Sequence, residues 1–152
     1  MNNDKDFEEF IKSLQKKIDI IEEKVYSKKV INEYKNPTNF GILKNADAYG
    51  EVKGSCGDTM KITLNLKNKK IIKGLFWTDG CGATIACGNM LMKIIKDKII
   101  DEISSISKEE LIKILDGLPK EHLHCAKLAI DTLKDAINDL KKNDIKRNNI
   151  VL

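Results

Sequence analysis

The chain has 152 residues, the size of one domain that can bury a core of its own. Hydrophobic residues make up 41% of the sequence and charged residues 33%, and no apolar run is long enough to span a membrane, so neither a disordered chain nor a membrane protein is expected. The net charge is +4, but Arg147 is the single arginine among 27 basic residues and aromatic residues make up 5%, which argues against nucleic-acid binding.

The first residues of the chain contain no apolar signal segment, so we expect a cytoplasmic location. Thiols are kept reduced in the cytosol. The four cysteines therefore favour metal or sulfur chemistry over disulfides.

The N-terminal part of the chain predicts two helices. Residues 5–25 place apolar side chains at steps of three and four, which is the pattern of an amphipathic helix. These positions are Phe7, Phe10, Ile11, Leu14, Ile18, Ile21 and Val25. A short second helix is expected from the Ser27 cap to about Tyr34, and a loop over 36–41 follows.

The middle of the chain predicts a small antiparallel sheet. Residues 59–66 alternate between apolar and polar, and the polar turn 67–70 leads into a strand at 71–78, so a hairpin is expected. A third strand at 49–55 would lead into Cys56 and complete a stable sheet.

The remainder of the chain predicts helices. From Gly82 the pattern is helical, and Ser107 with Glu110 forms a capping box for a helix that ends at Gly117. A long last helix follows, and the tail from Lys141 is expected to fray. The apolar face of that helix comprises Leu123, Ala126, Ile130, Leu133, Ile137 and Leu140.

The expected fold class is therefore α+β: a small antiparallel three-stranded sheet covered by helices, with an additional N-terminal amphipathic helix. We expect a helical extension at 1–24, a folded domain at 25–142 and a polar tail at 143–152.

Three of the four cysteines have neighbours that are unusual for core thiols. Cys56 lies in a glycine-bounded loop two residues before Asp58, and Cys81 lies between two glycines at a strand-to-helix junction. Glycine lets the backbone approach a ligand closely, and the start of a helix supports a thiolate. Cys87 lies on the apolar stripe of its helix, so we expect it to be part of the core.

The third unusual context is the pair His124 and Cys125. Both residues miss the apolar stripe of the last helix by roughly 100°, whereas a core cysteine should lie on it. His122 is expected at the surface. For Cys56 and Asp58, a capped turn before the strand remains an equally good interpretation.

If the fold collects these residues, Cys56, Cys81 and Cys125 with Asp58 or His124 form a tetrahedral, sulfur-rich site. Thiolates select zinc, copper(I) or iron–sulfur clusters. A permanent structural zinc would be expected to have four fixed ligands. A fourth ligand that is not fixed therefore favours a metal or cluster that is bound only temporarily.

Four segments carry a resemblance to a known family. They are Tyr26-Ser-Lys-Lys-Val-Ile-Asn-Glu-Tyr-Lys-Asn-Pro37, Gly-Ser-Cys56-Gly-Asp58, Gly80-Cys81-Gly82-Ala-Thr-Ile-Ala86, and Leu118-Pro119 followed by Leu-His124-Cys125. In this order and spacing, over about residues 25–140, the chain resembles the U-type iron–sulfur cluster scaffolds, which are IscU and the N-terminal domain of NifU.

The resemblance implies a scaffold rather than an enzyme. On it a transient [2Fe–2S] cluster would be built from iron and from sulfur delivered by a cysteine desulfurase, and then passed to apo-proteins. Cys56, Cys81 and Cys125 would be ligands and sulfur acceptors, Asp58 would keep the cluster labile, and His124 would be an alternative ligand. Such scaffolds also bind zinc at this site when the cluster is absent.

The chain departs from the family pattern in two places. The chaperone-recognition segment Leu-Pro-Pro-Val-Lys is here Leu118-Pro119-Lys120-Glu121-His122, so handover by an Hsp70-type chaperone is doubtful, and His122 is able to join the site instead of the lysine. The extension 1–24 would pack on the domain or mediate self-association as a homodimer. The alternative function is a zinc-binding sulfur acceptor of the SufU branch, but the long insertion of that branch between Cys81 and Cys125 is lacking.

Overall fold

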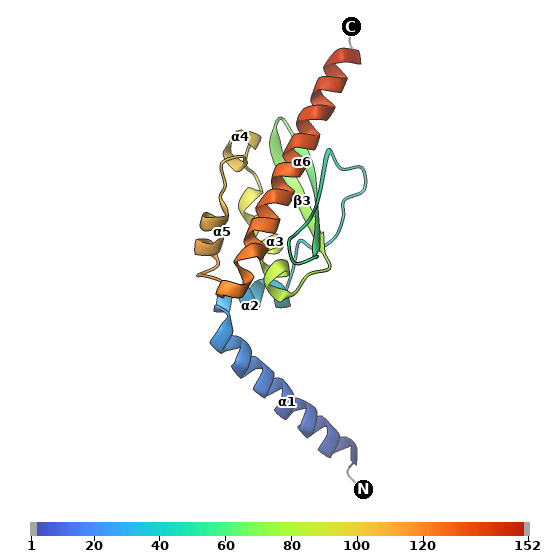
Figure 1. Cartoon of the computed structure of the whole chain (residues 1–152). Coiled ribbons are helices and arrows are strands. Elements are labelled where there is room, and N and C mark those ends of the chain that lie inside the picture. Colours follow the sequence, from blue (N-terminus) through green and yellow to red (C-terminus); the bar gives the residue numbers. More distant parts are fainter. Residues whose placement is uncertain (1–2, 151–152) are drawn as a thin grey trace.

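The computed structural model describes residues 3–150, and a three-stranded antiparallel sheet lies at its centre (Figure 1). The strands are β1 (Ala48–Lys53), β2 (Thr59–Lys67) and β3 (Lys70–Thr78), in the order β1-β2-β3. Asn68 and Lys69 alone connect β2 to β3, with φ angles of 55° and 65°. Positive φ at both residues is what a tight type I′ hairpin requires. The predicted sheet and hairpin are confirmed.

Helices account for the rest of the regular structure. They are α1 (Asn3–Val25), α2 (Lys28–Lys35), α3 (Gly82–Ile95), α4 (Ile100–Ile103), α5 (Lys108–Ile114), the 3₁₀ turn η1 (Lys120–His122) and α6 (Leu123–Ile150). The Ser27 hydroxyl accepts from Val30 N and so caps α2, and the predicted capping box of Ser107 and Glu110 begins α5. The fold is α+β, as the sequence pattern indicates.

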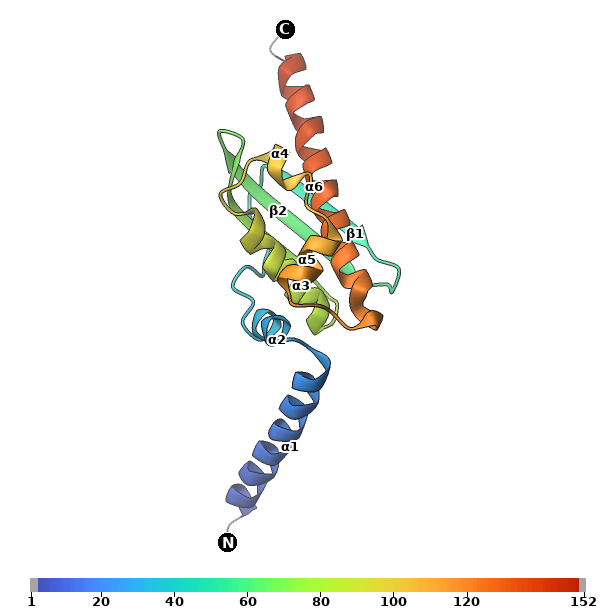
Figure 2. The ribbon, with the colours of Figure 1, turned by 90° about the vertical axis from the view of Figure 1, so that its left-hand side faces the viewer.

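The core lies between one face of the sheet and the helices α3 and α6 (Figure 2). Met60, Ile62 and Leu64 alternate along β2 and are fully buried, and they belong to the same apolar cluster as Leu91 of α3 and Leu133 of α6. The strict alternation along β2 therefore pointed to the correct buried face.

Helix α6 also protects the free edge of the sheet. The backbone N–H groups of Tyr49 and Glu51 in β1 donate to the carboxylates of Asp139 and Asp135, at 2.9 Å each. A Cβ atom on Gly50 would overlap the backbone of α6, so glycine is needed for this close approach. Unpaired edge N–H groups invite pairing with another chain, and here side chains of α6 occupy them.

The chain is helical at both ends of its described part. Helix α6 continues to Ile150, so residues 143–150 are helical instead of frayed; no glycine or proline interrupts them. Residues 151 and 152 of the expected tail lie outside the described part. Helix α1 forms as predicted, but it projects from the body of the molecule and buries none of its side chains (Figures 1 and 2). Within residues 3–150, no helix has both the length and the apolar character needed to cross a membrane.

Candidate functional site

The topology of the sheet brings two of the cysteine segments to the same end. The chain reverses once between β1 and β2 and again between β2 and β3, so the loop with Cys56 and the end of β3 before Cys81 lie at the same end of the sheet. The Asp79 carboxylate accepts from Thr59 N at 2.8 Å, and the Thr78 hydroxyl donates to Thr59 O at 2.7 Å. These bonds fasten the start of β2 to the end of β3.

Cys81 is the N-cap residue of α3, as the strand-to-helix junction predicts. A Cβ atom on Gly80 would lie 2.8 Å from the Thr84 side chain, so glycine allows the first turn of α3 to fold back closely. The buried Thr84 hydroxyl donates to Cys125 Sγ at 3.3 Å and lies 3.7 Å from Cys81 Sγ. Thr84 therefore links the two thiols.

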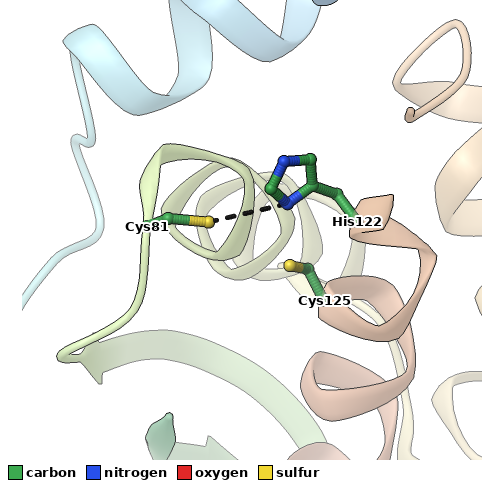
Figure 3. Close-up of side chains that lie close together, drawn as sticks. All are labelled: Cys81, His122 and Cys125. Carbon is green, nitrogen blue, oxygen red and sulfur yellow. Dashed lines mark hydrogen bonds between the residues drawn. The ribbon is translucent and has the colours of Figure 1, made fainter. Parts of the chain in front are cut away.

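Cys81, His122 and Cys125 form a compact group whose ligand atoms all lie within 4.8 Å of one another (Figure 3). Cys81 comes from the start of α3, His122 from η1, and Cys125 from the first turn of α6. Cys81 Sγ lies 3.8 Å from His122 Nδ1. Ligand atoms of a tetrahedral zinc ion lie roughly 3.5–3.8 Å apart, so the group has nearly the dimensions of a single-ion site.

His122 is held in this position by Tyr26. The Tyr26 hydroxyl lies 3.1 Å from Nε2 of His122, and the two rings are 5.7 Å apart between centroids. The residue pattern alone placed His122 at the surface. In the structure it is half-buried, and its Nδ1 faces Cys81.

Cys125 is fully buried, contrary to what its position off the apolar stripe suggested. Helix α6 has a second buried face, which packs against β1 where Gly50 admits it. That face carries the small residues Cys125, Ala129, Thr132 and Ala136. Burial raises the pKa of the Cys125 thiol to about 12, although the Thr84 hydrogen bond lowers it. The free thiol is therefore protonated at neutral pH.

Cys56 and Asp58 lie in the exposed loop between β1 and β2, where Cys56 Sγ donates to Asp58 Oδ2 at 3.3 Å. Gly57 between them has φ +91°, a conformation that side-chain-bearing residues rarely adopt. Cys56 lies outside the compact group, but its charge is close enough to contribute to the raised pKa of Cys125.

The two remaining candidates behave differently. His124 Nε2 lies 3.7 Å from Cys125 Sγ, and the His124 ring is 6.3 Å from the His122 ring between centroids. His124 therefore borders the compact group without belonging to it. Cys87 is fully buried in the core of α3, which confirms its predicted role, and burial raises its thiol pKa strongly.

Sequence reasoning missed two side chains of the site. Thr84 follows Cys81 by three residues in the first turn of α3, so helical spacing would have placed both on one side of the helix. Tyr26 offered no such signal, because 96 positions separate it from His122.

Comparison with known proteins agrees with this geometry. The family model described as the NifU-like N terminal domain matches residues 25–147. The iron-sulfur cluster assembly scaffold protein IscU 1 of Archaeoglobus fulgidus is 40% identical over 121 residues, which cover 78% of this chain and 79% of that relative. The scaffold protein IscU of Escherichia coli is 38% identical over 121 residues, covering 76% and 94% of the two chains.

Solved structures share the fold. The NifU-like N-terminal protein of Brucella abortus has a TM-score of 0.62 at 17% identity and covers 78% of this chain and 95% of its own. The structure titled as a putative SUF-system scaffold from Fervidobacterium islandicum has a TM-score of 0.61 at 22% identity, covering 74% and 96%. The matched family model and the two IscU relatives together show that this chain belongs to the family of NifU-like N-terminal domains.

Proposed function

We propose that this protein is a scaffold on which an iron–sulfur cluster is assembled and from which the cluster passes to apo-proteins. The observation that carries the proposal is the convergence of Cys81, His122 and Cys125 within 4.8 Å, beside the loop that bears Cys56. The scaffold role named for relatives at about 40% identity supports it. In this role the protein is a carrier rather than an enzyme.

The cargo is a [2Fe–2S] cluster, and three thiolates are available to hold it. Cys56, Cys81 and Cys125 supply sulfur, the ligand type that iron–sulfur clusters require. Asp58, His122 and His124 compete for the fourth position. An oxygen or nitrogen ligand there, in place of a fourth thiolate, suits a cluster that must be released.

The exposure of the thiols divides their roles. Cys56 and Cys81 are exposed, so each is accessible to a cysteine desulfurase that carries a persulfide. A thiolate of the scaffold attacks the outer sulfur of that persulfide, the S–S bond breaks, and the desulfurase cysteine leaves as a thiolate. Cys125 is buried between α3 and α6, so it holds the cluster from the protein side, opposite the exposed thiols.

Anaerobic reconstitution tests this function. Incubation with ferrous iron, cysteine, a cysteine desulfurase and a thiol reductant, which reduces the transferred sulfur to sulfide, should produce the visible sulfide-to-iron charge-transfer bands of a cluster. Cys56→Ala, Cys81→Ala and Cys125→Ala should each abolish these bands, whereas the matched Cys87→Ala variant, which changes a core thiol, should retain them. Normal assembly on Cys81→Ala would refute the proposal.

A second candidate function is that of a zinc-binding sulfur acceptor, which relays persulfide without forming a cluster. It is favoured by the near single-ion dimensions of the Cys81, His122 and Cys125 group. These residues fit zinc, which takes thiolate and imidazole ligands and leaves a fourth position open in reactive sites. The site would then hold zinc in the cluster-free scaffold as well.

Metal analysis of protein purified without oxygen separates the two functions. Zinc that resists exchange by iron and stimulates a desulfurase would favour the sulfur acceptor, whereas replacement of zinc by a cluster would favour the scaffold. Chelation should leave the thermal unfolding midpoint nearly unchanged, because the sheet and helices bury an apolar core without help from a metal.

A further inference from the structure

Six of the eight large apolar side chains of α1 follow a seven-residue repeat. Along the helix these six are spaced by four, three, four, three and four residues, which averages to the 3.5-residue period of a coiled coil. The six residues of this seam are Phe7, Ile11, Leu14, Ile18, Ile21 and Val25. The family model begins at residue 25, so nearly all of α1 lies outside the family domain.

The seam is open along its whole length. The exposed fractions of its six side chains range from 39% at Leu14 to 64% at Phe7. Lys35 of α2 forms salt bridges with Asp19 and Glu22 at 3.2 Å each, and these fasten the C-terminal end of α1 while the rest projects outward (Figures 1 and 2). A contiguous apolar stripe of this size marks an interaction surface.

We propose that α1 pairs with α1 of a second copy of this chain in a parallel, two-stranded coiled coil. The apolar a positions of the heptad are Ile11, Ile18 and Val25, all β-branched, and the d positions are Phe7, Leu14 and Ile21. β-Branched residues at a with leucine at the central d position favour two strands. The a positions and the central d position therefore indicate two chains, and the self-complementary seam makes a second copy the partner.

The charges beside the seam select the parallel orientation. In a parallel pair, Lys17 at position g faces Glu22 at position e of the second copy and joins Lys35, which already pairs with that carboxylate. This contact occurs twice by symmetry. In an antiparallel pair, Lys17 would face Lys17, and Glu8 would face Glu22. Opposite charges therefore meet in one orientation and like charges in the other.

The charge of α1 disfavours a lipid surface as the partner. The helix carries seven acidic and five basic side chains, so its net charge is negative, whereas helices that bind anionic membranes are rich in lysine and arginine. In the parallel pair, both domains follow directly from the C-terminal end of the coiled coil. The proposal does not depend on which metal or cluster the site holds.

Analytical ultracentrifugation of the full-length protein across the micromolar range tests the pairing. The wild type should sediment as a dimer. Ile18→Lys, which places a charge in the seam, should raise the dissociation constant of the dimer by at least about 100-fold. Ile20→Lys is the matched control: it changes the same residue type on the same helix at similar exposure, 53% against 49%, but outside the seam.

Circular dichroism should show both variants folded. A monomeric wild type, a dimer that survives Ile18→Lys, or equal loss of the dimer in both variants would each overturn the proposal. Orientation is tested by Asp4→Cys, because Asp4 occupies the seam position one heptad before Ile11. Mild oxidation should link the two residues at position 4 in a parallel pair, with the linked peptide identified by mass spectrometry. In an antiparallel pair they lie roughly 36 Å apart, so absence of that peptide from an oxidised dimer would overturn the orientation.

Discussion

The Tyr26 hydroxyl and Nε2 of His122 lie 3.1 Å apart, although 96 positions separate the two residues in the chain. When Nε2 of His122 carries the ring proton, it donates to the Tyr26 oxygen, and the Nδ1 lone pair is then directed at Cys81. Ring nitrogens of metal-binding histidines are commonly oriented by such an outer hydrogen bond. Tyr26 thus controls which nitrogen of His122 is presented to the site.

Replacing Tyr26 by phenylalanine should weaken zinc binding. Loss of an outer hydrogen bond of this kind typically lowers metal affinity by about 10–100-fold. Competition with a chromophoric chelator measures this affinity. Tyr49→Phe is the matched control, since it removes the hydrogen bond from an exposed tyrosine of β1 to Glu51. Equal zinc affinities of the two variants would show that Tyr26 does not position His122.

The two histidines should differ in their contribution to metal binding. His122 belongs to the compact group with Cys81 and Cys125, whereas His124 borders it. His122→Ala should therefore lower zinc affinity at least tenfold more than His124→Ala, a difference of about 1.4 kcal/mol. The same competition titration measures both variants. A larger loss in His124→Ala would assign the ligand role to His124 instead.

Asp58 should limit the lifetime of a bound cluster. Its carboxylate lies 3.3 Å from Cys56 Sγ, so it can compete with this thiol for iron, and a carboxylate oxygen holds an iron–sulfur cluster less well than a thiolate does. Asp58→Ala should thus slow the decay of the charge-transfer absorbance several-fold in the presence of a chelator. Asp101→Ala, at an exposed position of α4, serves as the control. Identical decay in both variants would argue against this role.

The four thiols should react with iodoacetamide in two classes. Cys56 and Cys81 are exposed, whereas Cys87 and Cys125 are buried with raised pKa values. With its pKa near 12, only about one Cys125 thiol in 10,000 is ionised at pH 8, and the thiolate is the reactive form. Peptide mapping after brief alkylation of the metal-free protein should find Cys56 and Cys81 modified first.

The pH dependence follows from the same shift. In the folded state Cys125 keeps its proton up to about pH 12, whereas in the unfolded state the thiol ionises near its ordinary pKa of 9.0. The free energy of unfolding of the metal-free protein should therefore fall as the pH rises from about 9 towards 12. The fraction of Cys125 thiolate in the folded protein should rise about tenfold per pH unit between about pH 9 and pH 11. Alkylation of Cys125 as fast as that of Cys56 at pH 8 would contradict its burial.

Glu33 should be important for stability rather than for the site. This residue of α2 is 4% exposed, and its carboxylate accepts from Asn89 and from Lys93 of α3, the latter at 2.7 Å. Glu33→Ala leaves the buried Asn89 amide without this acceptor, so the free energy of unfolding should fall by about 2–4 kcal/mol. Urea denaturation measures the loss. The exposed Glu109→Ala should change it by less than about 0.5 kcal/mol, and equal midpoints for the two variants would refute the assignment.

Local patterns in the sequence predicted the strands and most of the helices. Alternation along residues 59–66 predicted β2 and its buried face, and the Ser27 and Ser107 caps predicted the starts of α2 and α5. The apolar stripe likewise placed Cys87 in the core. These features depend on neighbours within a few residues, so the sequence displays them directly.

Contacts between distant segments could not be predicted from such local patterns. The burial of Cys125 depends on a second face of α6, which is buried because Gly50 lets β1 approach. The orientation of His122 depends on Tyr26 at the far end of the sequence. Neither relationship has a local spacing that would reveal it.

The sequence by itself identified three cysteines with glycine, aspartate or histidine neighbours as the candidate ligands, because ligand type is a property of single residues and their immediate context. The tertiary structure decided which of them meet: two antiparallel reversals bring the Cys56 loop and Cys81 to one end of the sheet, and α6 delivers Cys125 to the same end. It also placed His122 in the compact group. Proximity arises from packing across many positions of the chain, and no short motif encodes it.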